Sequence, residues 1–284
     1  PEVLAVESRR IFQPQAVVIT NVRVDHREEQ GGTKSRTAAS LSSAIAPGST
    51  VYVADREFQP EFEREARRLG ATLVRVGPTP ALPSPPDGVL ADGRLPAFPE
   101  DLDLALAVTG GLGIPRETAL RGMAAARPDF GVLKAWEADL GRPAAPWTLV
   151  SAFAANDPES TRRAIDRLEV VRTAPPRELI GVLNLRADRG DRTRQWIEAL
   201  DNGFFAGFAA LYIIGAHVRA RRWRRPAARP PLLRPLEARA PEPVMAALVG
   251  AHRAGAVVVG LGNMGGSGVS LVEHWERIVR PHAL

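Results

Sequence analysis

The sequence predicts an α/β fold with a mainly parallel sheet, and three observations support this prediction. Short β-branched runs alternate with longer amphipathic stretches along the chain, which is the pattern of strands joined by crossover helices. The 284 residues are enough for two ordinary domains with a sizeable core. Hydrophobic residues make up 45% of the chain and charged residues 24%, which is the composition of a globular protein rather than of a disordered or fibrous one.

The predicted elements follow one another in an alternating order. Strands are expected where short apolar, β-branched runs occur, at Ala16–Thr20, Thr50–Ala54, Thr72–Val76, Trp147–Phe153, Leu179–Leu185, Ala210–Ile214 and Ala256–Gly260. Helices are expected where apolar residues recur at helical spacing, at Glu61–Leu69, Leu102–Gly111, Arg116–Ala126, Pro158–Leu168, Thr193–Leu200, Pro241–Ala254 and Gly268–Val279. Gly70 fits the residue that ends the first helix, and Pro115 fits the start of the third.

Proline-rich stretches divide this pattern. The run Gly77–Pro99 contains too many prolines for a central strand, so we expect a surface excursion there. A second change of composition at Gly141–Pro146 precedes a fresh alternation of strands and helices. It indicates a boundary between a domain of residues 1–145 and one of residues 146–284. The tract Arg219–Pro235 has seven arginines and several prolines, which indicates an exposed loop.

The ends and the charge of the chain limit its function. It begins at Pro1, inside what resembles the end of a strand, so we expect a processed or partial product. The absence of cysteine excludes disulfides and thiolate metal sites. No signal peptide is visible, and the longest apolar stretch, Phe204–Val218, is too short to cross a bilayer. The net charge of +5 comes almost wholly from arginine, which favours an anionic substrate over nucleic acid because the arginine tract contains one aromatic residue and no recognisable module.

Two predicted strands end in polar turns that offer ligand groups. Asp25 and His26 follow the first strand, at the end where open α/β sheets bind ligands, and a neutral imidazole there can bind a divalent ion. The alternative, which spacing alone favours, is an Asp that caps a turn beside a solvated His. Asn156 and Asp157 follow the fourth strand and precede Pro158. Either Asn156 or Asp157 fits a helix cap, and the turn equally fits an anion site at a helix N-terminus.

Two further turns carry charge or glycine. In the loop after Leu179–Leu185, the arginines Arg186, Arg189 and Arg192 alternate with Asp188 and Asp191. Mutual ion pairs explain this loop as well as a carboxylate or phosphate site does, although its place at a strand end favours the site. The turn Gly260–Gly268 resembles a phosphate-binding glycine loop, but glycines also serve plain tight turns. The sequence Gly-x-x-x-x-Gly-Lys-Ser/Thr occurs nowhere in the chain.

In this order the segments resemble the ATP-dependent ligase subunit of poly-γ-glutamate synthases, within the superfamily of Mur and folylpolyglutamate ligases. The resemblance extends over essentially all 284 residues. It rests on Glu2–Val6, Thr20–Val22 with Asp25–His26, Phe153–Asp157 with Ser160–Thr161, Asn184 with Arg186–Arg192, and Gly260, Gly262, Asn263 and Gly268. It implies the second part of a Mur-ligase-type central ATPase domain, followed by a Rossmann-like C-terminal domain. It also implies that the chain begins after the P-loop and is inactive alone.

The resemblance implies a reaction in which ATP, with Mg²⁺, activates the γ-carboxylate of a polyglutamate chain as an acyl phosphate, which the amine of glutamate then attacks. It implies partners as well: a P-loop segment or chain, membrane subunits of a capsule synthase complex, and a second copy of the chain in a homo-oligomer, with no nucleic acid. The expected location is the cytoplasmic face of the membrane. A non-catalytic scaffold or binding protein that retains the ligase fold is the alternative.

The resemblance also assigns roles to single residues. Glu2 and His26 match metal-side positions, and Asn156 and Asp157 match positions that contact the nucleotide. Catalytic or substrate-side positions are matched by Lys134, Arg186, Asp188, Arg189 and Arg192. Two positions depart from the family pattern. Lys134 replaces an arginine and so lacks its planar fork, and Asp101 replaces an asparagine that faces adenine, so an ionised carboxylate there cannot donate a hydrogen bond.

Overall fold

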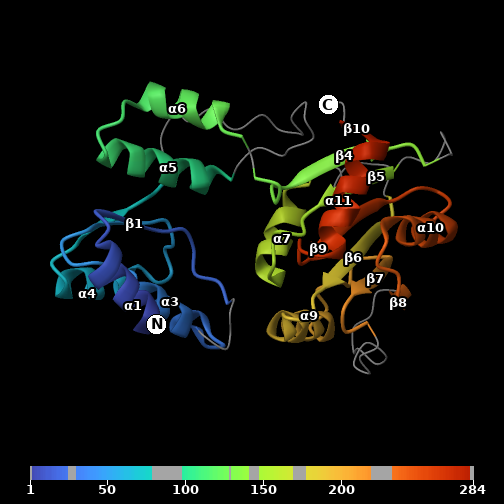
Figure 1. Cartoon of the computed structure of the whole chain (residues 1–284), viewed down its shortest axis with the longest axis horizontal. Helices are drawn as coiled ribbons and strands as arrows, with labels where there is room; N and C mark the ends of the chain where they lie inside the picture. Colours follow the sequence, from blue (N-terminus) through green and yellow to red (C-terminus); the bar gives the residue numbers. More distant parts are fainter. Residues whose placement is uncertain are drawn as a thin grey trace. The chain divides into compact units, whose positions relative to one another are not determined.

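The computed structural model describes residues 2–24, 30–78, 98–127, 129–140, 147–168, 177–218 and 232–281, and it divides into two compact units (Figure 1). The first unit contains the described residues up to 127, and the second contains those from 129 onward. Each unit has a sheet and hydrophobic clusters of its own. The two units are therefore described separately.

The first unit is built on a parallel sheet of three strands in the order β1-β2-β3. The strands are β1 (Ala16–Ile19), β2 (Thr50–Val53) and β3 (Thr72–Arg75). The helices are α3 (Lys34–Ser42), α4 (Gln59–Arg68), α5 (Pro99–Gly111) and α6 (Arg116–Ala125). One core cluster joins Val17, Val51 and Phe62, and a second contains Tyr52 and Leu104. Adjacent strand residues thus serve different clusters, as the two-residue period of a strand requires.

The N-terminus of the first unit differs from the prediction. Residues Glu2–Val6 form helix α1, and Glu7–Phe12 continue it as a π-helix. The expected strand end at the start of the chain is therefore wrong. A short apolar run does not distinguish a strand from a helix by its period. Here none of the five α1 residues is buried, and the segment is tied down instead by Arg9, whose Nε donates to the Ile45 carbonyl at 3.0 Å.

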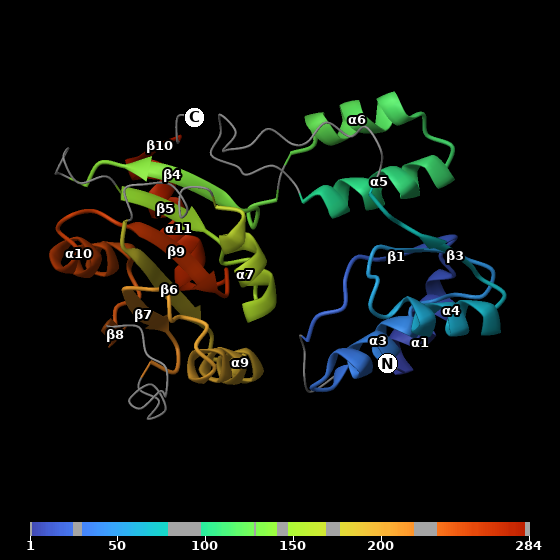
Figure 2. The ribbon, with the colours of Figure 1, turned by 180° about the vertical axis from the view of Figure 1, so that it is seen from behind.

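The second unit is built on a sheet of seven strands in the order β10-β4-β5-β9-β6-β7-β8 (Figure 2). Its strands are β4 (Lys134–Ala138), β5 (Trp147–Ser151), β6 (Leu179–Leu185), β7 (Ala210–Gly215), β8 (Leu232–Pro235), β9 (Val257–Gly262) and β10 (Val279–Pro281). The five strands from β5 to β8 in this order are parallel, and β4 and β10 add an antiparallel edge. The predicted α/β class with a mainly parallel sheet is confirmed.

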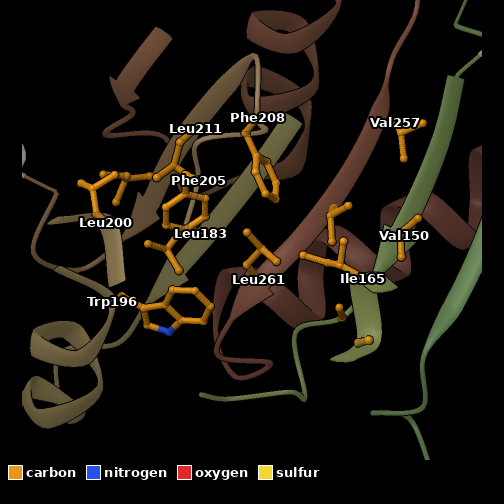
Figure 3. Packing of buried hydrophobic residues seen from close by; sticks show 14 of the residues in the cluster. Val150, Ile165, Leu183, Trp196, Leu200, Phe205, Phe208, Leu211, Val257 and Leu261 are labelled. Atoms are coloured by element: carbon orange, nitrogen blue, oxygen red, sulfur yellow. The ribbon is translucent and has the colours of Figure 1, made fainter. Parts of the chain in front are cut away.

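Helices cover both faces of this larger sheet. They are α7 (Pro158–Asp166), α9 (Gly190–Asp201), α10 (Pro241–Ala251) and α11 (Ser267–Ile278). Residues of α7 and α9, including Ile165 and Trp196, pack in one cluster with Leu183 and Leu261 (Figure 3). Residues of α10 and α11, including Trp275, pack in the other cluster. The sheet is therefore buried on both sides, which explains why its central strands are apolar without alternation.

All seven predicted strands and all seven predicted helices are present with small shifts at their ends. The prediction missed α1, α3, β4, β8 and β10. Strand β8 occupies Leu232–Pro235, so this part of the arginine tract is not the expected loop; residues 219–231 lie outside the described residues. The same holds for residues 79–97 of the expected proline-rich excursion. Strand β4 pairs with β5, which puts residues 134–138 in the second unit rather than before a boundary at 145.

Candidate ligand site at the carboxyl ends of β5, β6 and β9

Three adjacent parallel strands of the second unit end at the same edge of the sheet. β9 lies between β5 and β6, and each of the three is followed by a helix: α7 after β5, α9 after β6 and α11 after β9. Because all three strands are parallel, their helices begin at this one edge. Polar groups there lie beside helix N-termini, whose free N–H groups and dipoles favour anions.

Two buried asparagines join the ends of β6 and β9. The Asn184 side chain donates from Nδ2 to the carbonyls of Asn263 at 2.6 Å and Gly265 at 3.0 Å. In return, the backbone N–H of Asn263 donates to the Asn184 carbonyl at 3.0 Å. Asn184 is 1% exposed and Asn263 is 2% exposed. These reciprocal bonds fix the glycine turn after β9 against the loop after β6.

Glycines allow the close approach of these two loops. Gly262 has φ +89°, and a Cβ there would lie 2.5 Å from the Asn184 carbonyl oxygen. A Cβ on Gly265 would lie 2.4 Å from Nη1 of Arg186. The first contact is with backbone, which cannot move aside as a long side chain can. The glycines of the expected phosphate-type loop therefore serve close packing: Gly262 lies against the Asn184 backbone, and Gly265 lies against the Arg186 guanidinium.

The arginine loop contains both buried and exposed pairs. Arg186 donates two hydrogen bonds to the Asp188 carboxylate, from Nε to Oδ1 at 2.9 Å and from Nη2 to Oδ2 at 2.7 Å. The bond from Arg186 is the main cause that lowers the pKa of Asp188 below its usual value. Arg192 is 8% exposed and donates from Nη1 to Asn263 Oδ1 at 3.1 Å. Arg189 precedes α9, and its carbonyl accepts the Thr193 N–H at 3.1 Å.

The turn after β5 has a structural cap. Asp157 Oδ1 accepts the backbone N–H of Ser160 at 2.9 Å, so of the two residues that fitted the cap in the sequence it is Asp157 that caps α7. Asn156 lies next to this cap and is partly exposed. Upstream, the Phe153 ring stacks on Trp275 with centroids 5.9 Å apart and crosses Gly260, where a Cβ would meet it at 2.2 Å. The turn that carries Asn156 is thereby anchored to β9 and α11.

Lys134 is already paired within the second unit. Its Nζ lies 2.6 Å from Glu276 Oε1 of α11, and 5.8 Å from the centroid of the Trp136 ring. Its register partner across the sheet is Ser151, the last residue of β5. Lys134 is therefore close to the end of β5, but its ammonium group already forms an ion pair with Glu276.

The remaining predicted site residues are in the first unit or undescribed. Glu2 is exposed in the first turn of α1, and Asp101 is exposed in the first turn of α5, where a carboxylate is favourable to the helix dipole. His26 lies outside the described residues. Within the described ranges, no three His, Asp or Glu side chains gather as metal ligands. Of the two residues predicted to bind Mg²⁺, Glu2 thus has no such cluster around it among the described residues, and His26 stays a prediction.

The sequence predicted the charged loop as a ligand site but no structural role for the two asparagines that fix it. Asn184 is the one polar residue in the apolar strand Leu179–Leu185, and it is buried. Such a residue must find hydrogen-bond partners inside the protein. That signal was present in the sequence, whereas the identity of its partner on β9 follows only from the strand order. A separate depression of about 250 Å³ in the first unit, between α3 and α4, contains none of the predicted site residues.

Comparison with known proteins agrees with this architecture. Residues 139–278 match the family model described as the poly-gamma-glutamate synthase CapB C-terminal domain. The chain is 30% identical over 196 residues to PGA synthase CapB of Bacillus subtilis (strain 168). Residues 139–278 belong to the CapB C-terminal domain family. The chain is also 32% identical over 200 residues to the capsule biosynthesis protein CapB of Bacillus anthracis. It covers 48% and 41% of these two CapB proteins, and each alignment covers 69% of the chain.

Solved structures of Mur and folylpolyglutamate ligases have a similar fold. MurF from Acinetobacter baumannii superposes with a TM-score of 0.65 at 18% identity, over 95% of the chain and 62% of MurF. A bifunctional folylpolyglutamate synthase/dihydrofolate synthase from Yersinia pestis, complexed with AMPPNP and a Mn ion, gives a TM-score of 0.58 at 15% identity, over 92% of the chain and 62% of that protein. At these identities the likeness concerns the fold, with a Rossmann-like second unit. In the described parts of the chain, no helix has the length and apolarity to span a bilayer.

Proposed function

We propose that the chain is part of an ATP-dependent amide ligase of poly-γ-glutamate synthesis. The observation that supports this most directly is the match of residues 139–278 to the CapB C-terminal domain. The same residues contain the edge at which the Asn156–Asp157 turn, the Arg186–Arg192 loop and the Asn263 turn end adjacent strands. In the proposed reaction ATP activates a γ-carboxylate as an acyl phosphate, and the amine of glutamate attacks it to form the amide bond.

The residues of the chain itself would act on carboxylate substrates. The Arg186 guanidinium already binds one carboxylate, that of Asp188, in the two-bond geometry that a glutamate carboxylate needs. This pair is largely exposed, and exposed ion pairs contribute little to stability, so a substrate carboxylate can replace Asp188 at low cost. Arg192, by contrast, is buried and bonded to Asn263. We assign Arg186 to substrate binding and Arg192 to holding the loop.

The nucleotide would lie on the turn that follows β5. Asn156 has an amide that both donates and accepts hydrogen bonds, and it lies beside the N-terminus of α7. Asp157 is the α7 cap, so its effect on the nucleotide would come through the shape of the turn. Lys134, Asp188, Arg189, Asp101, Glu2 and His26 stay predictions. So do the partners: a P-loop-bearing segment or chain, membrane subunits of a capsule synthase, and a second copy of the chain.

The proposal is tested in the organism that encodes the chain, by replacing Arg186 with alanine in the chromosomal gene. We expect loss of most ATP-dependent incorporation of labelled glutamate into polymer in cell extracts. Arg194→Ala is the matched control, because Arg194 is an exposed arginine of the same loop-to-helix region. Normal incorporation by Arg186→Ala would contradict the substrate role. Absence of any incorporation in the unmodified extract, with ATP and Mg²⁺ present, would contradict the ligase function.

A non-catalytic binding protein is the second candidate, and one observation favours it. Two of the four cations expected to meet anionic groups, Arg186 and Lys134, have carboxylate partners inside the chain, Asp188 and Glu276. A protein that had lost its chemistry could retain such internal pairs without loss. In that case extracts of a strain that lacks the gene would incorporate labelled glutamate at the unmodified rate.

A further inference from the structure

Exposed large apolar side chains are concentrated in one short stretch of the first unit. Among the described residues ten such side chains are exposed, and five of them lie between positions 3 and 18. These five are between 43% and 73% exposed, and they are Val3, Val6, Ile11, Phe12 and Val18. Single exposed apolar residues are normal on a protein surface, whereas a local concentration of them indicates an interaction surface.

The helix formed by α1 and η1 is attached to the unit through polar side chains. Ser8 is its one buried residue, and the Ser8 hydroxyl donates to the Ala44 carbonyl. Arg9 Nε donates to the Ile45 carbonyl at 3.0 Å, and Arg9 Nη2 lies 2.7 Å from Glu65 Oε1. A surface helix normally packs through its apolar side. Here the large apolar side chains of the helix are left for another polypeptide to cover.

Strand β1 offers an open edge to such a polypeptide. Among the described residues β1 has a strand neighbour, β2, on one side only, and all four of its residues, Ala16–Ile19, are apolar. The strand at the opposite edge, β3, contains Thr72 and Arg75, and Arg75 pairs with Glu63. Charged side chains on an edge strand discourage pairing with a further strand. Of the two edges, β1 is therefore the one suited to accept a strand.

The helix and the edge of β1 belong to the same region of the unit. Phe12 and Ala16, the first residue of β1, are four positions apart in the chain. Ile45, whose carbonyl binds Arg9, packs in the same core cluster as Val17 and Ile19 of β1. A polypeptide that pairs with β1 can therefore reach the apolar side chains of α1 and η1 as well.

The chemistry of the occupant follows from the proposed function, on which this inference rests. The proposed reaction needs a polypeptide that binds the ATP phosphates, and the sequence Gly-x-x-x-x-Gly-Lys-Ser/Thr does not occur in the chain. The two CapB relatives have further polypeptide, because the chain covers 48% and 41% of their length. In a P-loop motif the glycine loop joins a strand to a helix. A P-loop-bearing polypeptide therefore brings a strand of its own to an open sheet edge.

We propose that β1 and the exposed apolar side of α1 and η1 form the docking surface for the P-loop-bearing polypeptide of the ligase. This polypeptide adds a strand to the sheet at β1 and covers Val18. It also covers the apolar side chains of the helix, among which Phe12 is the most exposed.

Photo-cross-linking in the organism that encodes the chain tests the surface. Phe12 is replaced with p-benzoylphenylalanine, and the cross-linked peptides are identified by mass spectrometry. We expect attachment to a polypeptide that contains the Gly-x-x-x-x-Gly-Lys-Ser/Thr sequence. The matched control has the cross-linker at Leu232, which is 36% exposed on β8, the edge strand of the larger sheet, and it should not attach there. Attachment from position 12 to a second copy of the chain alone, or to no polypeptide, would overturn the proposal.

A charge on β1 tests the strand pairing. Val18 is 43% exposed, so the Val18→Lys chain should fold, and circular dichroism of the purified chain checks this. We expect the cross-link from position 12 to fall about tenfold, because pairing would bury the added charge. Leu232→Lys should leave the cross-link unchanged. An undiminished cross-link in folded Val18→Lys would overturn the pairing at β1.

Glutamate incorporation in the same extracts separates this proposal from the ligase function. If the unmodified strain and the Val18→Lys strain incorporate labelled glutamate at the same rate, the docking surface is wrong and the ligase function stands. If position 12 attaches to the P-loop-bearing polypeptide in a strain whose extracts incorporate no glutamate, the docking surface stands and the ligase function fails.

Discussion

The two units differ in how completely their sheets are covered. In the second unit every residue of β5 and β9 is buried, and clusters with four tryptophans and three buried phenylalanines cover both faces. In the first unit β3 has no buried residue, and the large apolar side chains Val3, Val6, Ile11, Phe12 and Val18 are exposed. Because burial of apolar surface is the main stabilising contribution, we expect the first unit to unfold at lower denaturant concentration.

The largest expected effect is the loss of stability of one unit alone, which two spectroscopic probes can distinguish. All five tryptophans are at position 136 or later, in the stretch of sequence that belongs to the second unit, whereas helix content is spread over both units. Tryptophan fluorescence therefore follows the second unit alone, and far-ultraviolet circular dichroism follows both. Phe62→Ala should cost about 3–5 kcal/mol, as large core truncations do, and remove the early dichroism transition. The fluorescence transition should stay in place.

Trp196→Ala should destabilise the second unit and not the first, and it should lower the free energy of unfolding of the second unit by about 3–5 kcal/mol. It should lower the midpoint of the fluorescence transition in urea and leave the early transition unchanged. Phe12→Ala is the control, because Phe12 is 73% exposed and surface truncations change stability by less than about 0.5 kcal/mol. Coincident transitions by the two probes in the unmodified protein would refute unequal stability of the units.

Two glycines with positive φ, one in each unit, differ in whether an added Cβ would meet a neighbouring atom. Gly262 in the second unit and Gly48 in the first both have positive φ, +89° and +71°. A Cβ would meet the Asn184 carbonyl at Gly262 and nothing within 4 Å at Gly48. Gly262→Ala should therefore cost about 3 kcal/mol, and Gly48→Ala about 1 kcal/mol from strain alone. Urea denaturation measures both, and equal costs would show that the asparagine link yields easily.

The sequence sufficed for most of the fold because local patterns carry it. Strands β6, β7 and β9 of the second unit were predicted from apolar, β-branched runs, and they are buried as those runs require. Strand β8 could not be predicted in the same way. Leu232–Pro235 contains a proline and is exposed on an edge, so its strand conformation comes from pairing with β7, which local sequence does not encode.

The candidate site divides in a similar way. The cap at Asp157 follows from local sequence alone, because an Asp before Pro158 fits the N-terminus of a helix. The bond from Asn184 to Asn263 and the bonds of His252 with Glu178 and Tyr212 join residues 79, 74 and 40 positions apart. Such links depend on which strands are neighbours. The sequence of an arginine-rich loop does not distinguish arginines that pair within the chain, as Arg186 does with Asp188, from arginines that bind a ligand.

Alkaline pH should affect the second unit through its buried tyrosine. Burial is the main cause that raises the pKa of Tyr212 above the ordinary value of 10.0. The unfolded phenol therefore ionises first, and the stability that Tyr212 contributes is full below pH about 10 and is lost as the pH rises toward the folded pKa. Tyr212→Phe should cost about 1–2 kcal/mol near neutral pH because His252 loses a partner, and should lose less stability in alkali. Urea denaturation followed by fluorescence at several pH values measures both effects. If the free energy of unfolding fell with pH equally in the unmodified protein and in Tyr212→Phe, the role of Tyr212 in alkali would be contradicted.

The smallest expected effect compares one helix cap in each unit. Asp157 accepts the Ser160 N–H at 2.9 Å in the second unit, and Thr33 accepts the Arg36 N–H at 3.3 Å in the first. A charged cap at shorter distance also gains from the helix dipole. Asp157→Ala should therefore cost about 1 kcal/mol, visible by fluorescence, and Thr33→Ala about 0.5 kcal/mol, visible only in the early dichroism transition. If Thr33→Ala moved the fluorescence transition as well, the two units would unfold as one, and the contrast in burial between them would have no consequence for stability.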